Sequence, residues 1–269
     1  MLHFDVNISM LLKEYPFLDR FDQAAKLGFD AVEFWWPTGE DLNAITQRVR
    51  DTGLQVALFN FDAGDMPNGD RGLLNDPERQ AQFRANVPVA IELAQQLGCT
   101  KINALAGKWN PEESREAQLQ RVQENLHWAA EQAHAAGITV LVEAINTWEN
   151  GPYMFTKTLE TLTFLKQVGA PNLVFQYDVY HMYRMEGNVV SNMREYGAHF
   201  GHIQIADSPD RHHPGTGELN YPFILQSIID SGYTGMIGLE YKPRDSSAAS
   251  FVWLPEDRRG NLSVESLRL

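Results

Sequence analysis

The chain has 269 residues, 43% of them hydrophobic, and its 22 basic and 35 acidic residues give a formal charge of −13. This length is enough for one large core and is typical of a single α/β barrel. The negative charge would repel phosphate backbones and anionic bilayers, which argues against nucleic acid and membranes as partners. The single cysteine, Cys99, excludes internal disulfides and thiolate metal sites and favours a reducing compartment. No apolar run approaches membrane-spanning length, and no basic targeting segment is visible. We therefore expect a soluble, cytoplasmic protein.

The first half of the chain alternates between two patterns. Short runs of β-branched and aromatic residues predict strands, and longer segments with apolar residues every three or four positions predict helices. Glycines after several helical segments are suitable C-terminal caps, and Pro111 suits the first turn of a helix. In chain order we expect strand 4–10, helix 17–27, strand 31–36, helix 41–52, strand 55–61, helix 77–97, strand 101–106 and helix 111–136.

The second half continues the alternation. It predicts strand 139–144, helix 156–168, strand 174–180, helix 190–199, strand 201–206, helix 221–231 and strand 236–241. Eight strands alternating with helices indicate an α/β protein with a parallel sheet closed into a (β/α)8 TIM barrel. We expect one barrel domain over residues 1–244. Residues 245–269 form a tail that could be a degraded eighth helix, an arm onto a partner subunit or a mobile end.

Four of the predicted strands end in, or close to, an oxygen-bearing side chain. These residues are Glu143, Asp178, Gln204 and Glu240, and successive ones are separated by about one strand plus one helix. In such barrels the active site lies at the C-terminal ends of the strands, so the four oxygens should converge. Three carboxylates would repel one another without a cation, and an all-oxygen set suits Mg²⁺ or Mn²⁺ better than Zn²⁺. The alternative for each acid alone is a solvated strand end.

Several charged residues near the same mouth are candidates for binding an anionic substrate. Arg71 and Lys108 follow strands and could hold a carboxylate, while His181 lies three residues beyond Asp178. Taken alone, Glu149 and Arg211 read as surface charges in loops. His202 shares a strand face with Gln204 and reads as a structural histidine, and the pair at 212–213 reads as a solvated turn.

Motifs spread over about residues 1–244 resemble hydroxypyruvate isomerase, within the wider group of xylose-isomerase-like barrels that includes ketose 3-epimerases and 2-oxo-tetronate isomerases. The matching segments are Asn7-Ile8-Ser9-Met10, Gly28-Phe29-Asp30-Ala31-Val32-Glu33-Phe34, Ala63-Gly64-Asp65, Gly69-Asp70-Arg71-Gly72, Lys101-Ile102-Asn103, Val142-Glu143-Ala144-Ile145-Asn146, Gln176-Tyr177-Asp178-Val179-Tyr180-His181-Met182, His202-Ile203-Gln204-Ile205-Ala206-Asp207, Pro214-Gly215-Thr216-Gly217-Glu218 and Glu240-Tyr241-Lys242-Pro243.

The resemblance implies a metal-dependent isomerase that interconverts hydroxypyruvate and tartronate semialdehyde through an enediolate. It implies that Glu143, Asp178, Gln204 and Glu240 bind the metal and that Glu143 and Glu240 also move protons. Substrate contacts are implied for three residues, namely His181, Glu149 and Arg211. Many epimerase relatives have histidine where this chain has Gln204, which favours the isomerase branch.

Other functions stay open at this point. A 2-oxo-tetronate isomerase or a ketose 3-epimerase would use the same site with a longer pocket. An abasic-site endonuclease on the same barrel would need more histidine ligands and a basic groove. The formal charge of −13 argues against such a groove. A sugar-binding barrel without catalysis would show no proton exchange. The sequence leaves assembly into a homo-oligomer undecided.

Overall fold

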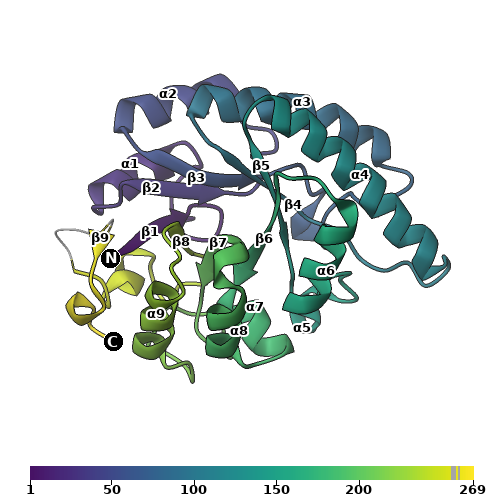
Figure 1. Ribbon diagram of the computed structural model, residues 1–269. Helices are drawn as coiled ribbons and strands as arrows, with labels where there is room; N and C mark the ends of the chain where they lie inside the picture. The colour runs from purple at the N-terminus through teal and green to yellow at the C-terminus, as the bar shows by residue number, and fades with distance from the viewer. Residues whose placement is uncertain (256–258, 260) are drawn as a thin grey trace.

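The computed structural model describes residues 1–255, 259 and 261–269. Eight parallel strands form its centre, and β1 pairs with both β2 and β8, so the sheet closes on itself (Figure 1). The predicted TIM barrel is therefore confirmed. The strands are β1 Leu2–Asn7, β2 Ala31–Phe34, β3 Gln55–Asn60, β4 Lys101–Ala104, β5 Thr139–Glu143, β6 Leu173–Asp178, β7 Phe200–Ile205 and β8 Met236–Leu239.

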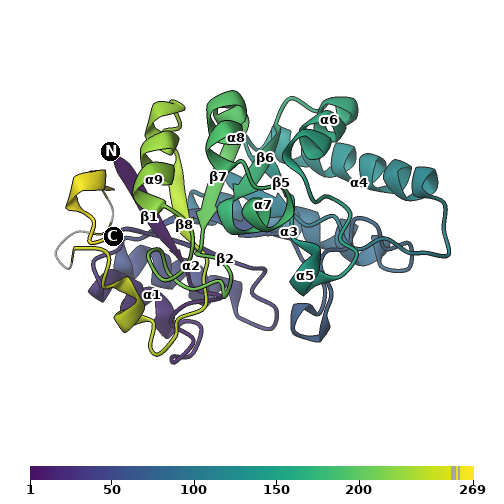
Figure 2. The same cartoon turned by 90° about the horizontal axis from the view of Figure 1, so that it is seen from below.

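Helices connect successive strands and lie outside the barrel (Figures 1 and 2). None of those among the described residues is long and apolar enough to cross a membrane. The helices are α1 Asp19–Lys26, α2 Leu42–Thr52, α3 Gln80–Leu97, α4 Arg115–Ala135, α5 Thr147–Asn150, α6 Thr158–Val168, α7 Val179–Met185, α8 Val189–Tyr196 and α9 Tyr221–Asp230, with 3₁₀ turns η1 Met66–Asn68, η2 Gly197–His199, η3 Ala248–Phe251 and η4 Val264–Ser266.

Local side-chain contacts explain where several elements begin and end. The Asp41 carboxylate caps the start of α2, and Gly53 adopts a left-handed conformation at its end. The start predicted for the 111–136 helix is wrong, because the Ser114 hydroxyl accepts the Ala117 amide and α4 begins at Arg115 rather than near Pro111. The start of α4 is therefore set by its capping serine rather than by Pro111.

All eight predicted strands run one to three residues beyond their observed ends, and in two of them a polar side chain ends the strand. The oxygen of Asn7 accepts the backbone amides of Ser9 and Met10, which turns the chain out of the sheet. The carboxylate of Asp178 accepts the His181 amide and caps α7, a helix that sequence patterning did not predict. Both residues therefore lie at the mouth of the barrel.

The hydrophobic core lies between the strands and the helices, whereas the barrel interior is unusually polar. In β1 the apolar residues Phe4 and Val6 alternate with Asp5 and Asn7, and all four are buried. The polar set continues around the barrel, where branched aliphatic residues are common in this fold. It comprises Asp5, Asn7, Glu33, Asn103, Glu143, Gln176, Asp178, His202, Gln204 and Glu240.

The chain after residue 244 packs back onto the barrel. Trp253 is buried and meets Phe4 edge-on, with ring centroids 5.4 Å apart. Strand β9 Asn261–Leu262 pairs antiparallel with β1, so the two ends of the chain lie close together (Figure 1). Among the described residues beyond β8 the helical turns are of the 3₁₀ type, in the place of an eighth barrel helix.

Candidate active site at the barrel mouth

The four predicted oxygen-bearing residues all lie at the C-terminal ends of strands. Glu143 and Asp178 are the last residues of β5 and β6, Gln204 is the penultimate residue of β7, and Glu240 directly follows β8. Asp178 is aligned with Gln204 across the β6–β7 pair. All four are buried. The strand-end positions expected from the sequence are confirmed.

A cavity of about 290 Å³ opens above these strand ends. Glu143 and Glu240 both line it, together with His181, Arg71 and Arg211. Its remaining lining residues are Lys13, Trp35, Asn60, Met66, Pro67, Leu105, Ile145 and Asn150. The cavity therefore has a size suited to a small molecule and combines acids with fixed positive charges.

The three carboxylates of the cluster strongly affect one another. Glu143, Asp178 and Glu240 each offer an oxygen within 4.8 Å of the others and of a ring nitrogen of His181. Burial, followed by repulsion from Glu240 and Asp178, raises the pKa of Glu143 well above its usual value. Burial also raises the pKa of Asp178 to about 6 and of Glu240 to about 7, although Arg211 opposes both shifts. A bound cation would relieve this repulsion.

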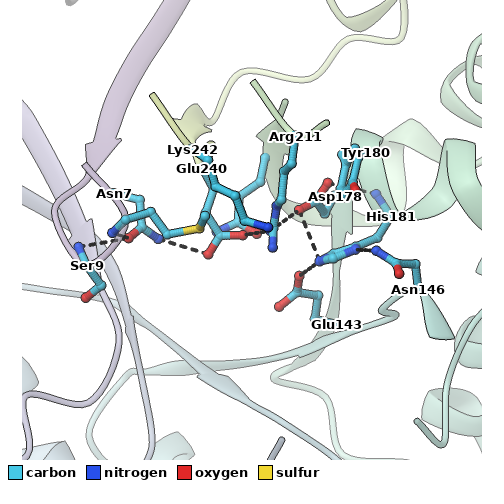
Figure 3. A network of polar contacts seen from close by, with 12 residues as sticks. Asn7, Ser9, Glu143, Asn146, Asp178, Tyr180, His181, Arg211, Glu240 and Lys242 are labelled. Carbon is cyan, nitrogen blue, oxygen red and sulfur yellow. Dashed lines mark hydrogen bonds and ion pairs between the residues drawn. The ribbon is translucent and has the colours of Figure 1, made fainter. Parts of the chain in front are cut away.

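A cationic side chain already occupies part of the space between these acids. The guanidinium of Arg211 hydrogen-bonds to Glu240 and, at 3.2 Å, to Oδ2 of Asp178 (Figure 3). It also lies over the Tyr180 ring, 5.3 Å from its centroid. The sequence-based interpretation of Arg211 as a surface charge was therefore wrong. Its position shows that the carboxylates accept a positive charge, and their hard oxygen donors fit a divalent ion such as Mg²⁺ or Mn²⁺.

The loop that carries Arg211 is held in place by Asp207, which lies two residues after the end of β7. Its carboxylate accepts the backbone amides of Gly215, Thr216 and Gly217. A side chain at Gly217 would place a Cβ 1.9 Å from the carbonyl oxygen of Ser208. This segment is therefore a scaffold that shapes the loop, and it brings Arg211 back over the barrel mouth.

Gln204 differs from the three acids in its hydrogen bonds. Its Nε2 donates to Glu33 Oε1 at 2.7 Å, and its Oε1 accepts from Gln176 Nε2 at 2.7 Å. A carbonyl oxygen has two lone pairs, so one remains for a metal ion. The role of Gln204 as a metal ligand stays a prediction.

The protonation of His181 follows from its neighbours. Asn146 accepts the Glu149 amide through Oδ1, so its Nδ2 faces Nδ1 of His181, 2.7 Å away (Figure 3). Burial lowers the pKa of His181 well below its usual value, which keeps the ring neutral. The proton then resides on Nε2, which lies 3.6 Å from Asp178 and 3.9 Å from Glu143. This tautomer suits donation to a substrate oxygen better than metal ligation.

The remaining predicted binding residues divide into two groups. Arg71 lines the cavity and is held there by Asn150 Oδ1 at 2.5 Å. Glu149 accepts the Tyr180 hydroxyl at 2.8 Å and Lys242 at 3.1 Å, so it is half-buried at the rim rather than a free surface charge. Lys108 is not brought to the carboxylates. It donates to the Gly69 carbonyl and lines a neighbouring cavity of about 400 Å³ that also includes Arg71.

Sequence reasoning missed the neutral polar residues that surround the acids. Asn7 Nδ2 and the Trp35 indole donate to Oε1 of Glu240 at 3.0 and 3.1 Å, and Asn103 donates to Glu143 at 3.1 Å. Asn7 and Asn103 are buried polar residues that each follow a buried apolar residue in a strand. That position is the signal that could have identified them, since a buried polar side chain needs a partner.

A scan against family models matches residues 21–258 to the family described as xylose isomerase-like TIM barrel. The chain belongs to this family. Two curated relatives are each 41% identical over 254 residues, which is 94% of this chain and 98% of theirs. They are hydroxypyruvate isomerase of Escherichia coli and 2-oxo-tetronate isomerase of Cupriavidus necator. The resemblance to hydroxypyruvate isomerase is thus confirmed, as is the prediction of an isomerase-type enzyme.

Solved structures of this family share the same barrel. A Brucella melitensis protein described as an AP endonuclease, family 2, is 37% identical, has a TM-score of 0.90, and matches over 94% of this chain and 98% of its own. The 3-keto-D-glucoside 4-epimerase of E. coli has a TM-score of 0.79 at 19% identity, over 94% of this chain and 98% of its own, and shows the shared fold alone.

Proposed function

We propose that this protein is a metal-dependent isomerase that interconverts hydroxypyruvate and tartronate semialdehyde through an enediolate. One observation carries the proposal. Two buried carboxylates with raised pKa values, Glu143 and Glu240, line one small cavity together with arginines. A carboxylate that is shielded from water and lies beside the substrate can take up a proton and return one. The relatives named as hydroxypyruvate isomerase support the choice of substrate.

Glu143, Asp178, Gln204 and Glu240 would hold the metal, for which we propose Mg²⁺ or Mn²⁺. When bound, such an ion acts as a Lewis acid that stabilises negative charge on the substrate oxygens. Asn103 and Asn7 donate to the two glutamates and so fix their orientation. The metal would thus be added to a set of side chains that is already ordered by hydrogen bonds.

The substrate carboxylate would be held by the arginines of the cavity. Arg71 and Arg211 both line the cavity, and Arg211 reaches it from the loop after β7. A guanidinium matches a carboxylate through two parallel hydrogen bonds, which also fixes the orientation of the substrate. Lys108 is less well placed for this role, and Glu149 would act indirectly by holding Lys242 and Tyr180 at the rim.

The reaction needs one proton removed from C3 and one delivered to C2. One of Glu143 and Glu240 takes the C3 proton, leaving an enediolate whose electrons lie between C3 and C2. The other returns a proton to C2. The O3 hydroxyl loses its proton while O2 gains one, which gives the aldehyde and the new alcohol. The Nε2–H of His181 lies beside Glu143 and Asp178 and can hydrogen-bond to the oxygens during this exchange.

A 2-oxo-tetronate isomerase is the second candidate, supported by a relative of that name at the same 41% identity. The same acids would serve, and the neighbouring cavity that shares Arg71 offers further space for the longer substrate. Ketose 3-epimerases share the fold, but their solved structures are 19–23% identical and add no support for their substrates.

A nuclease is disfavoured despite the description of the Brucella protein. The chain carries a charge of −13, which would repel a phosphate backbone. A sugar-binding barrel without catalysis would show no proton exchange. We also propose a cytoplasmic location, supported by the single cysteine, whereas the sequence leaves homo-oligomer formation undecided.

Proton NMR in D₂O tests the proposal directly. Metal-stripped protein is mixed with hydroxypyruvate and then given Mg²⁺, or Mn²⁺ at trace level to limit line broadening. We expect deuterium to enter C3 only after metal is added, with tartronate semialdehyde appearing at the same time.

Each other outcome points to a specific alternative. Exchange without that product would support proton abstraction but indicate a longer oxo acid, which 2-oxo-tetronate would test. An absence of exchange with every metal would contradict the hydroxypyruvate isomerase proposal. A screen of four- to six-carbon sugars and acids would then follow.

A further inference from the structure

A buried carboxylate beneath the cavity, Glu33, connects two residues of the candidate active site. Glu33 Oε1 accepts Nε2 of Gln204 at 2.7 Å and Nδ2 of Asn7 at 2.9 Å. The same Nδ2 of Asn7 donates to Oε1 of Glu240 at 3.0 Å. Glu33 has no exposed surface and does not line the cavity, so it cannot touch the substrate. Its influence must pass through its partners.

His202 holds the second oxygen of Glu33. Its Nε2 lies 2.7 Å from Oε2 of Glu33, and β7 and β2 are not neighbours in the sheet, so this contact crosses the barrel interior. The first oxygen, Oε1, accepts from Asn7 and Gln204, so both oxygens of Glu33 have hydrogen-bond partners.

The orientation of the Gln204 amide follows from a neighbour whose own orientation is fixed. The oxygen of Asn7 accepts the backbone amides of Ser9 and Met10, so its NH₂ group donates to Oε1 of Glu33 and to Glu240. Because Oε1 of Glu33 is thereby an acceptor, the NH₂ group of Gln204 faces it, and the Gln204 oxygen points the other way, where it accepts from Gln176.

The strand opposite Glu33 is shaped to accommodate it. A Cβ built on Gly238 would lie 2.4 Å from Oε2 and 2.8 Å from Oε1 of Glu33. Gly238 is aligned with Gln204 in the β7–β8 pair and with Asp5 in the β1–β8 pair. The absence of a side chain at this position in a buried strand leaves the space that the Glu33 carboxylate occupies.

We propose that Glu33 is a positioning residue that presents the carbonyl oxygen of Gln204 to the metal and holds Glu240 through Asn7. This inference rests on the proposed metal site. It explains why Glu33 is paired with a glutamine at position 204. The amide nitrogen of Gln204 donates to Glu33, and its oxygen can bind the ion. Hydrogen-bond partners of metal ligands typically affect metal affinity by about 10- to 100-fold.

The test is calorimetric titration of Mn²⁺ into metal-stripped protein, which measures affinity without relying on turnover. Glu33→Met keeps the length of the side chain but removes both acceptor oxygens, so the amides of Gln204 and Asn7 lose the partner that orients them. We expect Mn²⁺ binding to weaken by about 10- to 100-fold. Glu40→Gln, at an exposed position, is the matched control and should bind as the unsubstituted protein does.

Glu33→Gln makes the test specific for orientation. Its side-chain oxygen can still accept from Asn7 and Gln204, while its NH₂ group would face Nε2 of His202, whose other ring nitrogen can carry the proton. We expect this variant to retain much of the affinity that Glu33→Met loses. Retention would also separate the positioning role from a general effect of the Glu33 charge.

The results distinguish this inference from the proposed function. If the unsubstituted protein binds no divalent cation, the metal site and the positioning role both fail. If it binds Mn²⁺ and folded Glu33→Met binds it equally well, only the positioning role is overturned. A folded Glu33→Gln variant that binds as poorly as Glu33→Met would overturn it as well.

Discussion

Asn146 donates through Nδ2 to Nδ1 of His181 over 2.7 Å, and this single contact determines which ring nitrogen carries the proton. Because Asn146 uses its oxygen to cap α5 at the Glu149 amide, the amide cannot turn over without losing the cap. His181 therefore presents Nε2–H to the cavity, as a donor, rather than a lone pair.

Replacing Asn146 with aspartate should reverse this arrangement. A carboxylate keeps the α5 cap but accepts from Nδ1, so the proton moves to Nδ1 and Nε2 becomes a lone-pair donor able to bind metal. We expect the ¹⁵N chemical shifts of His181 to report the new tautomer and turnover to fall by about 10²- to 10⁴-fold, as for loss of a proton-transferring group. Asn146→Ser, which retains a capping oxygen, is the control for α5. Unchanged shifts in the aspartate variant would contradict the assignment.

Replacing each of the two buried glutamates, Glu143 and Glu240, with glutamine should block a different step of the reaction. The variant that lacks the base should lose deuterium exchange at C3 altogether. The variant that lacks the other acid should still exchange but form product slowly. We expect turnover to fall by about 10²- to 10⁴-fold in Glu143→Gln and Glu240→Gln, with the fold intact. Circular dichroism and the exposed control Glu112→Gln check folding. Normal activity with bound metal in Glu240→Gln would remove Glu240 from the mechanism.

Arg211 and a divalent cation should compete for the same carboxylates. In the absence of metal, Arg211→Gln leaves Asp178 and Glu240 without their cationic partner. Removing one member of a buried ion pair costs about 3–5 kcal/mol, so urea unfolding in EDTA should show a loss of that order. Added Mn²⁺ should restore most of it, and Arg211→Lys should lose less in EDTA. An equal loss with and without Mn²⁺ would show that Arg211 and the metal do not share these oxygens.

Alternation of strand and helix patterns was enough to predict the barrel and the strand-end positions of Glu143, Asp178, Gln204 and Glu240. Both depend on local periodicity and on the geometry of the fold. The placement of Arg211 was not predictable, because it depends on how Asp207 folds the long loop after β7.

The same limit applies to the interior of the barrel. Glu33 lies in an apolar strand and His202 reads as a lone structural histidine, and only the closed barrel brings the two within 2.7 Å across its interior. Arg71 and Lys108 looked equivalent in sequence. A hydrogen bond to Asn150 directs Arg71 into the cavity, while Lys108 is directed to the Gly69 carbonyl.

Cys99 should be chemically inert in the folded protein. Burial raises the pKa of its thiol from 9.0 to about 12. At pH 8 the thiolate fraction is then lower by roughly three orders of magnitude, and alkylation by iodoacetamide should slow by at least that factor relative to the urea-unfolded chain. Because the native thiol keeps its proton where the unfolded thiol loses it, its contribution to stability is present below about pH 9 and decreases from there to about pH 12. Rapid labelling of native protein would contradict this burial.

The segment after residue 244 should contribute to the stability of the barrel itself. Trp253 is 2% exposed and packs edge-on against Phe4 of β1, and the neighbouring Phe251 meets Phe29 with centroids 4.9 Å apart. Truncating a buried tryptophan typically costs about 3–5 kcal/mol, and we expect Trp253→Ala to lower the free energy of unfolding by that amount. Val252→Ala is the matched control, since its side chain is 59% exposed and should change stability by less than about 0.5 kcal/mol. Urea unfolding followed by circular dichroism measures both. If the two variants unfold at the same urea concentration as the unsubstituted protein, the segment is a mobile end in solution, and the barrel of residues 1–244 is stable without it.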